Sequence, residues 1–210
     1  MKYIYQLISR YPALNVCKAD LEAAATALIK CFEDGGKLLI AGNGGSCADS
    51  DHISGELLKS FCKKRTPSSD LINSLKAIDE ETGAYLADKL QGSLPVIALT
   101  NNTALMTASL NDVDGNVMFA QQVNGYGKKG DIFLGISTSG NSKDIIYPTV
   151  LAKAKGLTTI ALTGKNGGKL KRLADISIVV PQQETFMIQE LHLPVYHALC
   201  LEVEEYFWKE

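Results

Sequence analysis

Three groups of residues in this chain have the types and spacing to do chemistry, and the first is a glycine turn followed by a predicted helix. Gly42-Asn43-Gly44-Gly45-Ser46 follows an apolar run at 37–41. Such a turn directs backbone N–H groups and the positive end of a helix dipole towards one point, which suits a phosphate or another anion. On the same predicted helix His52 and Glu56 are four residues apart and share a face just behind that point. A histidine and a carboxylate one helical turn apart can bind a metal ion or move protons.

The second group is a loop rich in hydroxyls, Ser137-Thr138-Ser139-Gly140-Asn141-Ser142, which follows an apolar run at 131–136. Hydroxyls and amide N–H groups can surround phosphate oxygens without a cation. Helix capping and tight turns use the same residue types, and one such loop alone would favour that structural role. Because two serine-bearing loops follow two predicted strands, we favour a phosphate site.

The third group is on the last predicted helix, where Gln189 and His197 are eight residues apart and therefore lie on about the same face. A lone histidine more often has a surface or core role, and that interpretation covers His192. For His52 and Glu56 the structural alternative is an ordinary helix contact worth a few tenths of a kcal/mol. Their position behind the glycine turn favours a functional role.

The hydrophobic pattern predicts the elements that must position these groups. Short apolar runs predict five buried strands, and residues at helical spacing predict helices between them. This alternation implies parallel pairing and right-handed crossovers, hence a three-layer α/β sandwich with a central parallel five-stranded sheet. The predicted strands are 37–41, 94–99, 131–136, 157–162 and 176–180; the predicted helices are 2–10, 16–35, 46–61, 101–110, 117–126, 143–155, a short one from 169, and 185–208, with a polar turn at 111–116.

The domain organisation follows from length and from one segment that interrupts the alternation. A chain of 210 residues with 46% hydrophobic content can bury one full core, so we expect a single domain over 1–210 with N-terminal helices at about 1–35. An extra helical segment lies at about 63–93. Within it, residues 70–90 predict one or two exposed helical pieces that form a lid or an oligomer contact.

Composition excludes several classes of protein. The formal net charge is -2, from 21 basic and 23 acidic residues, which gives no electrostatic basis for binding nucleic acid. No apolar run reaches the length of a membrane span, and the start of the chain lacks a signal-peptide profile. The five cysteines are an odd number at mostly helical apolar positions, which favours buried thiols in a reducing cytoplasm over disulfides. The glycine turn also lacks the G-x-G-x-x-G spacing of a dinucleotide-binding domain.

Four linked motifs, in order along nearly the whole chain, resemble the sugar isomerase (SIS) domain family and, within it, the phosphoheptose isomerases. The resemblance implies a flavodoxin-like sandwich, a homotetramer with active sites at subunit interfaces, and an intramolecular oxidoreductase that converts sedoheptulose 7-phosphate to D-glycero-D-manno-heptose 7-phosphate through an enediol. The motifs are 42–46 with His52 and Glu56; 137–142; Leu162-Thr163-Gly164-Lys165 with Gly167-Gly168; and Ile188-Gln189-Glu190-Leu191-His192 with His197.

The resemblance also implies roles for individual residues. Glu56 and His197 would be the proton-transfer pair, which aldose–ketose isomerisation needs together with charge stabilisation at the neighbouring oxygens. The phosphate would be held by Ser137, Thr138, Ser139 and Ser142; the sugar would be bound by Asn43, Gly44, Gly45, Gln189 and the pair Asn111-Asp112; and one zinc ion per site would be bound by His52, Glu56, Gln189 and His197.

Two alternatives stay open at this point. A non-catalytic SIS-domain protein would bind a sugar phosphate or a replication-initiator partner, but it would not need Glu56 together with His197. An isomerase of a hexose or aminosugar phosphate would use the segment after Phe61, which is longer than the family pattern leads us to expect, to change its specificity.

Overall fold

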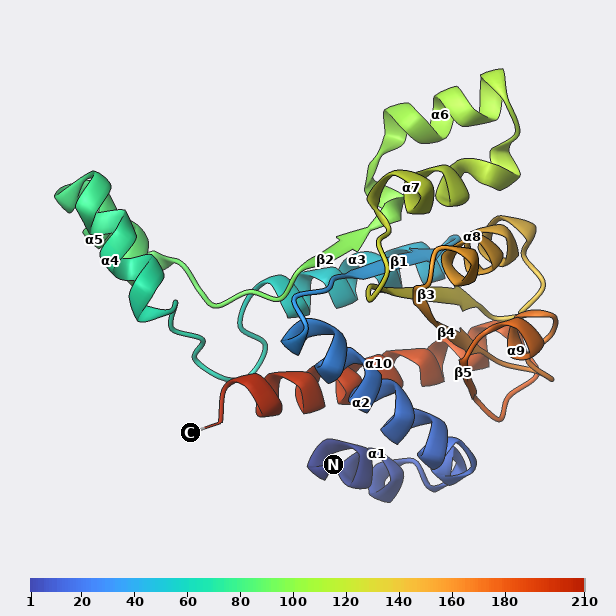
Figure 1. Cartoon of the computed structure of the whole chain (residues 1–210). Coiled ribbons are helices and arrows are strands. Elements are labelled where there is room, and N and C mark those ends of the chain that lie inside the picture. The colour runs from blue at the N-terminus through green and yellow to red at the C-terminus, as the bar shows by residue number, and fades with distance from the viewer. Residues whose placement is uncertain (210) are drawn as a thin grey trace.

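The computed structural model describes residues 1–209, and its centre is a sheet of five parallel strands (Figure 1). The strands are β1 (Leu38–Gly42), β2 (Val96–Ala98), β3 (Ile132–Ser137), β4 (Thr158–Thr163) and β5 (Ile176–Val179). Their order is β2-β1-β3-β4-β5, and every neighbouring pair is parallel. This order is that of the flavodoxin-like sheets. The α/β fold with five parallel strands is therefore confirmed.

Side chains along each strand alternate between two hydrophobic cores, one on each face of the sheet. Leu38 and Ile40 of β1 belong to one core, whereas Leu39 and Ala41 belong to the other. A parallel sheet covered by helices on both faces is buried on both sides, so its strands are continuous apolar runs. The run at 37–41 could be predicted as a strand for this reason.

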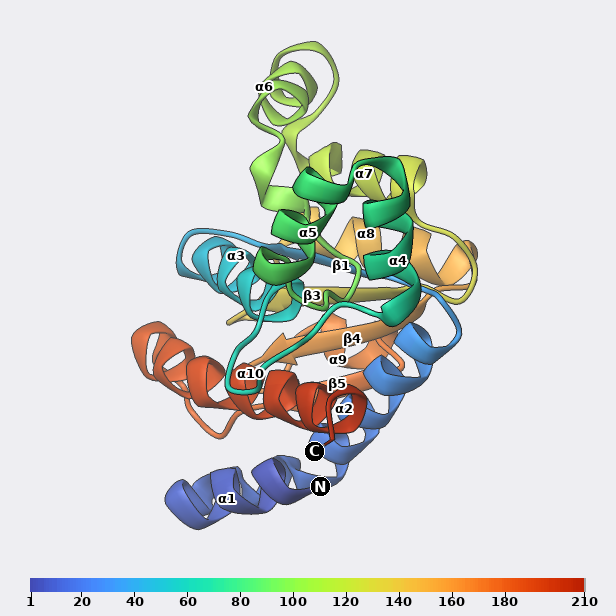
Figure 2. The ribbon, with the colours of Figure 1, turned by 90° about the vertical axis from the view of Figure 1, so that its left-hand side faces the viewer.

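Helices form the outer two layers of the sandwich (Figures 1 and 2). One layer packs into the core that contains Leu38, and the other into the core that contains Leu39. The first layer comprises α1 (Lys2–Arg10), α2 (Lys18–Glu33), α3 (Gly45–Leu58) and α10 (Thr185–Phe207); the second comprises α7 (Met118–Tyr126), α8 (Lys143–Ala154) and α9 (Leu170–Leu173); short 3-10 turns lie at Pro12–Cys17, Leu99–Asn101 and Gly115–Val117. No helix in the described part of the chain is both long and apolar enough to cross a membrane.

Two helical parts stand away from these layers. α4 (Ser69–Ile78) and α5 (Glu80–Lys89) pack against each other at the end of two extended connections, and α6 (Thr103–Asp112) projects beyond β2 (Figure 1). Along α4 and α5 only Gly83 is buried. The exposed helical segment predicted after residue 63 is thus a pair of helices, which we call the α4–α5 arm.

Two predicted helix ends differ from the structure. α6 continues through Asp112, so Asn111 and Asp112 are helical rather than part of a polar turn, because no glycine or proline occurs before Gly115. α3 ends at Leu58 and not near 61. Its end is fixed from outside the helix. The Arg65 guanidinium donates hydrogen bonds to the carbonyls of Glu56 and Leu57, which a further turn of helix would otherwise use.

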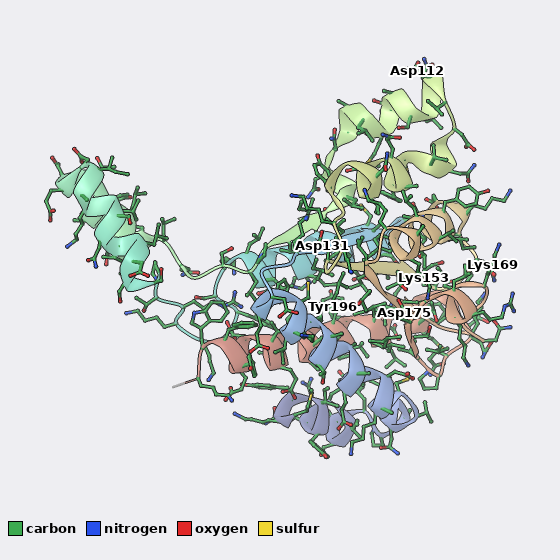
Figure 3. The ribbon with its side chains drawn as sticks, in the orientation of Figure 1. Asp112, Asp131, Lys153, Lys169, Asp175 and Tyr196 are labelled. Atoms are coloured by element: carbon green, nitrogen blue, oxygen red, sulfur yellow. The ribbon has the colours of Figure 1, made fainter. Side chains whose placement is uncertain are left out.

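The amino edge of the sheet is held by a carboxylate that joins two strands. Asp131, labelled in Figure 3, accepts hydrogen bonds from the backbone N–H groups of Lys37 and Lys128 at 3.0 and 2.8 Å. It also pairs with the Lys37 ammonium at 2.6 Å. This ion pair lies at the edge where β1 and β3 begin, opposite the edge that carries the candidate site.

Candidate active site

The candidate site begins at the carboxyl edge of the sheet, between β1 and β3. These neighbouring strands lead into crossovers that run in opposite directions, so the edge between their ends is the topological switch point where ligands bind in open parallel sheets. A hollow of about 260 Å³, which we call the loop pocket, lies there. It is lined by Asn43, Gly44, Gly45, Ser46, Ile136, Ser137, Thr138, Ser142, Thr185 and Gln189.

Three helices start at the loop pocket. α3 begins at Gly45, α8 begins directly after Ser142, and α10 begins at Thr185. Their dipoles place partial positive charge at the same end, although at the start of α3 the N–H groups of Ser46 and Cys47 already donate to the carbonyls of Asn43 and Gly44. No residue lining the pocket, within the described chain, carries a charged side chain. An anion placed there would meet backbone dipoles and hydroxyls rather than a charged side chain.

Two of the glycines around this pocket show why a side chain would not fit there. Gly140 has φ +64°, and a Cβ there would lie 2.0 Å from the Gly167 carbonyl oxygen, so the hydroxyl-rich loop at 137–142, which we call the serine loop, packs tightly on the loop after β4. A Cβ on Gly45 would lie 2.6 Å from Nε2 of Gln189. The Gln189 amide can approach the first turn of α3 only because residue 45 has no side chain.

The close approach of Gln189 to Gly45 shows how α10 and α3 are arranged. Further along the same two helices, His197 lies beside His52, with ring centroids 5.0 Å apart. The two helices thus run side by side in the same direction, and both start at the loop pocket (Figure 2). Since Gln189 and His197 are eight residues apart, the histidines lie about 12 Å behind the pocket.

A second cluster of functional groups forms at that depth, and we call it the histidine cluster: His52, Glu56, Tyr196 and His197. His52 Nε2 lies 3.1 Å from Glu56 Oε1, and His52 Nδ1 lies 3.0 Å from the Tyr196 hydroxyl. Tyr196 is labelled in Figure 3, near the middle of the molecule. The Glu56 side chain is 14% exposed and that of His52 is 41% exposed, so a ligand can reach the pair from solvent. Glu56 and His197 are thereby brought into one cluster within a single chain.

Asp49 lies close to the hydroxyl of Tyr196. Burial raises the pKa of Asp49, and a hydrogen bond with Tyr196 opposes this rise. Burial and the nearby Asp49 carboxylate raise the pKa of Tyr196 above its ordinary value of 10.0. Tyr196 is therefore a neutral donor to Asp49, and its oxygen can accept the Nδ1–H of His52.

His197 has the properties of a group that exchanges protons. Burial, with the adjacent His52, lowers its pKa below the ordinary 6.5, although Glu56 opposes this effect. Its Nε2 is buried and has no hydrogen-bond partner in the structure. The ring of Phe61 packs on it with centroids 5.3 Å apart. A neutral imidazole with an unpartnered nitrogen can donate or accept a proton once a ligand arrives.

Most of the residues predicted for the phosphate and sugar lie in the loop pocket, but three do not. The Ser139 hydroxyl accepts a hydrogen bond from the Asn141 backbone N–H within its own loop. Asn111 and Asp112 lie at the end of α6, where the Asn111 amide donates to Asp112 at 2.7 Å. Figure 3 shows Asp112 at the tip of this projecting helix, away from Tyr196. Within one chain these two residues do not line the loop pocket.

Sequence reasoning did not predict three residues of the site. Thr185 lines the loop pocket beside Ser46 of the predicted glycine turn, and it is the first residue of a helix, which is a signal that could have been used. Asp49 is one turn before His52 on the same helix face. Tyr196 had no comparable signal, because only the packing of α10 on α3 brings its hydroxyl to His52.

The predicted zinc ligands are only partly assembled. His52, Glu56 and His197 are neighbours, whereas Gln189 lies two turns away against Gly45. No three His, Cys, Asp or Glu side chains among residues 1–209 are arranged to hold a metal ion. The donor types nevertheless fit zinc, and the unpartnered His197 Nε2 is free to act as a ligand. Zinc stays a prediction.

Comparison with known proteins gives a consistent result. The family model for the SIS domain matches residues 86–164, which contain β2, β3, β4 and the serine loop. A phosphoheptose isomerase of Aneurinibacillus thermoaerophilus is 40% identical over 185 residues, which are 88% of this chain and 80% of that protein.

Solved structures agree over almost the full length. A phosphoheptose isomerase from Francisella tularensis superposes with a TM-score of 0.77 at 31% identity, covering 97% of this chain and 95% of that one. The phosphoheptose isomerase GmhA from Neisseria gonorrhoeae gives a TM-score of 0.75 at 30% identity, covering 96% and 94%.

Proposed function

Because this chain belongs to the phosphoheptose isomerase family of SIS-domain proteins, we propose that it is an isomerase that interconverts sedoheptulose 7-phosphate and D-glycero-D-manno-heptose 7-phosphate. The observation that carries the proposal is the distance between the loop pocket and the histidine cluster. An anion pocket built from three helix starts lies about 12 Å from a cluster with a carboxylate and a neutral imidazole. A sugar of seven carbons with a terminal phosphate is long enough to reach from one to the other.

The loop pocket supplies binding and orientation. Ser137, Thr138 and Ser142 present hydroxyls to the phosphate, and the starts of α3 and α10 add backbone N–H groups. Asn43 and Gln189 present amides in the same pocket, where they can contact the sugar. Holding the phosphate fixes the far end of the sugar, so that C1 and C2 meet the catalytic groups in one orientation.

The histidine cluster supplies the proton transfers. Starting from the ketose, the Glu56 carboxylate removes a proton from C1, a C1–C2 double bond forms, and O2 takes a proton from His197. The enediol then receives a proton at C2 from Glu56 and loses the O1 proton to His197, which leaves an aldehyde at C1. Each group ends in its starting protonation state. The Ser139, Asn111 and Asp112 assignments stay predictions of this proposal.

The experiment is incubation of the purified chain with sedoheptulose 7-phosphate, with and without zinc, followed by separation of the heptose phosphates. We expect the aldose to appear, and other ketose phosphates to react much more slowly. Binding of the ketose without conversion would instead support a non-catalytic SIS-domain protein. Faster reaction of a hexose or aminosugar phosphate would reassign the substrate.

We extend the proposal to one zinc ion per site, held by His52, Glu56, Gln189 and His197. With zinc bound, donation from His52 Nδ1 to Tyr196 would leave the Nε2 lone pair for the metal, whereas without a metal Nε2 faces the Glu56 carboxylate and carries the proton of that contact. A bound divalent ion would polarise the oxygens at C1 and C2. After chelation, zinc should raise the melting temperature of the native chain but not of the His52→Ala variant. Equal shifts in both would remove the zinc site.

We also propose a homotetramer without nucleic-acid or membrane partners. Leu71, Ile78 and Tyr85 on the α4–α5 arm are 45%, 86% and 63% exposed, and Leu110 on α6 is 72% exposed. Isolated pairs of helices this short are barely stable in water, so we expect another copy to cover them. A neighbouring copy could also present Asn111 and Asp112 to the loop pocket. Light scattering during gel filtration should give the mass of four chains; the mass of one chain would contradict this.

The last part of the proposal concerns the domain bounds and the cellular compartment of the chain. We propose one SIS domain over 1–210, with N-terminal helices at about 1–35 and an added segment at about 63–93. All five cysteines are free thiols, and Cys17, Cys31 and Cys200 are buried, which suits a reducing compartment such as the cytoplasm. Thiol titration of the protein denatured without reductant should count five.

A further inference from the structure

The most completely buried charged pair in the described chain lies directly behind the histidine cluster. Arg65 and Glu204 have side chains that are 0% and 1% exposed, and Arg65 Nε donates to Glu204 Oε1 at 2.8 Å. The Arg65 guanidinium also stacks on the ring of Trp208 at 4.6 Å. Replacing such a pair by apolar residues is often neutral or stabilising, so stability alone gives little reason for its presence.

The remaining donors of Arg65 reach the helix that carries Glu56. Nη2 donates to the backbone carbonyl of Glu56, and Nη1 donates to that of Leu57, each at 2.8 Å. These carbonyls belong to the last turn of α3, which has no helical partner for them, and the positive guanidinium also suits the negative end of the helix. The planar fork of arginine can bind both carbonyls and a carboxylate at once, which lysine cannot.

Glu204 connects the same pair to His197. Its two carboxylate oxygens accept hydrogen bonds from the backbone N–H groups of Phe61 and Cys62, each at 2.9 Å. Phe61 in turn packs its ring on His197. Burial opposes ionisation of Glu204, but these hydrogen bonds and Arg65 outweigh it and hold the pKa of Glu204 below its ordinary value. Glu204 is also on α10, two turns beyond His197.

We infer that Arg65 and Glu204 are positioning residues for the isomerisation: they set the distance and angle between Glu56 on α3 and His197 on α10. The inference rests on the proposed function, in which these two groups exchange protons with the sugar. One member of the pair holds the backbone of Glu56. The other holds the loop whose Phe61 backs His197. Neither touches the loop pocket, so phosphate binding should not depend on them.

The test is the double variant Arg65→Met/Glu204→Leu, assayed with sedoheptulose 7-phosphate. It removes both charges together, because a single change would leave the other charge buried and unpaired and could prevent folding. We expect kcat to fall about 10- to 100-fold, since a displacement of about 1 Å at a reacting group can cost that much. KM should stay within about threefold. Incorporation of deuterium from D2O into the sugar should slow in parallel with kcat.

Two further variants keep the result interpretable. Lys37→Met breaks another largely buried ion pair, at the opposite edge of the sheet, and should lower the melting temperature without changing kcat. Arg65→Lys keeps the charge but loses the fork, and should lower kcat less than the double variant. If the double variant does not fold, the Arg65→Lys variant decides by the same kcat and KM criteria.

Some outcomes would reject the positioning role, and another would reject the proposed function. A folded double variant, or a folded Arg65→Lys variant when the double variant fails, with kcat within about twofold of the native chain would overturn the positioning role. Turnover lost in Glu56→Gln but retained in these variants would reject only this inference. Turnover retained in Glu56→Gln would reject the proposed function itself.

Discussion

Two pairs of neighbouring helices differ sharply in this molecule. α3 and α10 lie on the sheet and bury apolar side chains in the core that contains Leu38, and they carry every member of the histidine cluster. The α4–α5 arm stands away from the sheet and exposes its apolar side chains (Figure 1). Groups that exchange protons need positions fixed to a fraction of an ångström, and only the packed pair provides them.

The largest difference between the pairs should appear on replacing a glutamate in each. Glu56→Gln removes the proposed base without changing side-chain size, so we expect kcat to fall about 10²- to 10⁴-fold while sugar-phosphate binding persists. Glu81→Gln, in the first turn of α5, is the matched control and should leave kcat unchanged. Steady-state kinetics and direct titration with sedoheptulose 7-phosphate measure both quantities. Full activity in Glu56→Gln would refute its assignment as the base.

The second prediction concerns how folding stability depends on pH, through a histidine on α10, one of the two helices packed on the sheet. Burial lowers the pKa of His192 on α10 from 6.5 to about 4, although its hydrogen bond to the Thr163 carbonyl opposes this shift. Below pH 6.5 the unfolded chain takes up a proton that the folded chain refuses, so stability is present above pH 6.5 and is lost as the pH falls towards 4. The loss from this residue reaches about 3 kcal/mol.

Denaturant unfolding at several pH values tests this effect. The native chain should lose stability between pH 6.5 and about 4, and His192→Gln should show a flatter dependence over the same range. Since other acidic groups titrate in both proteins, the difference between the two curves isolates His192. Parallel curves would contradict the expectation and imply that water or a rearrangement solvates the protonated ring.

How much of this difference the sequence can predict depends on how far apart along the chain the interacting residues lie. The five strands were predictable because continuous apolar runs are a local signal, and the loop pocket followed because parallel strands end at one edge. The meeting of His52 with His197 has no local signal, and only the family motifs anticipated it. The contact between Arg65 and Glu204 spans 139 residues of sequence and was not predictable.

Helix ends and oligomer contacts were also beyond local rules. Asn111 and Asp112 were expected in a turn, but polar residues without glycine or proline can continue a helix. The role of residues 63–93 depends on the molecule that covers them, and a single chain does not include that molecule.

The third prediction separates binding from chemistry within the site. Ser137→Ala and Thr138→Val each remove a hydroxyl from the loop pocket, and a hydrogen bond to a charged group is worth about 1.5–3 kcal/mol. KM should rise about 10- to 100-fold with little change in kcat, the reverse of the pattern for Glu56→Gln. Ser177→Ala, a hydroxyl on β5 that bonds to Lys171, is the control. A fall in kcat with constant KM would place these hydroxyls at the reacting carbons.

The smallest expected effect concerns the α4–α5 arm. The Asp79 side chain caps α5 by accepting a hydrogen bond from the Thr82 N–H at 2.7 Å, so Asp79→Ala should cost about 1 kcal/mol of local helix stability. Because the arm contributes almost nothing to either core, amide exchange in α5 should accelerate about fivefold while the global unfolding midpoint stays constant. Asp88→Ala, which removes no cap, should change neither. Loss of global stability equal to the local loss would show that the arm unfolds with the sheet, and the two helix pairs would then form one cooperative unit.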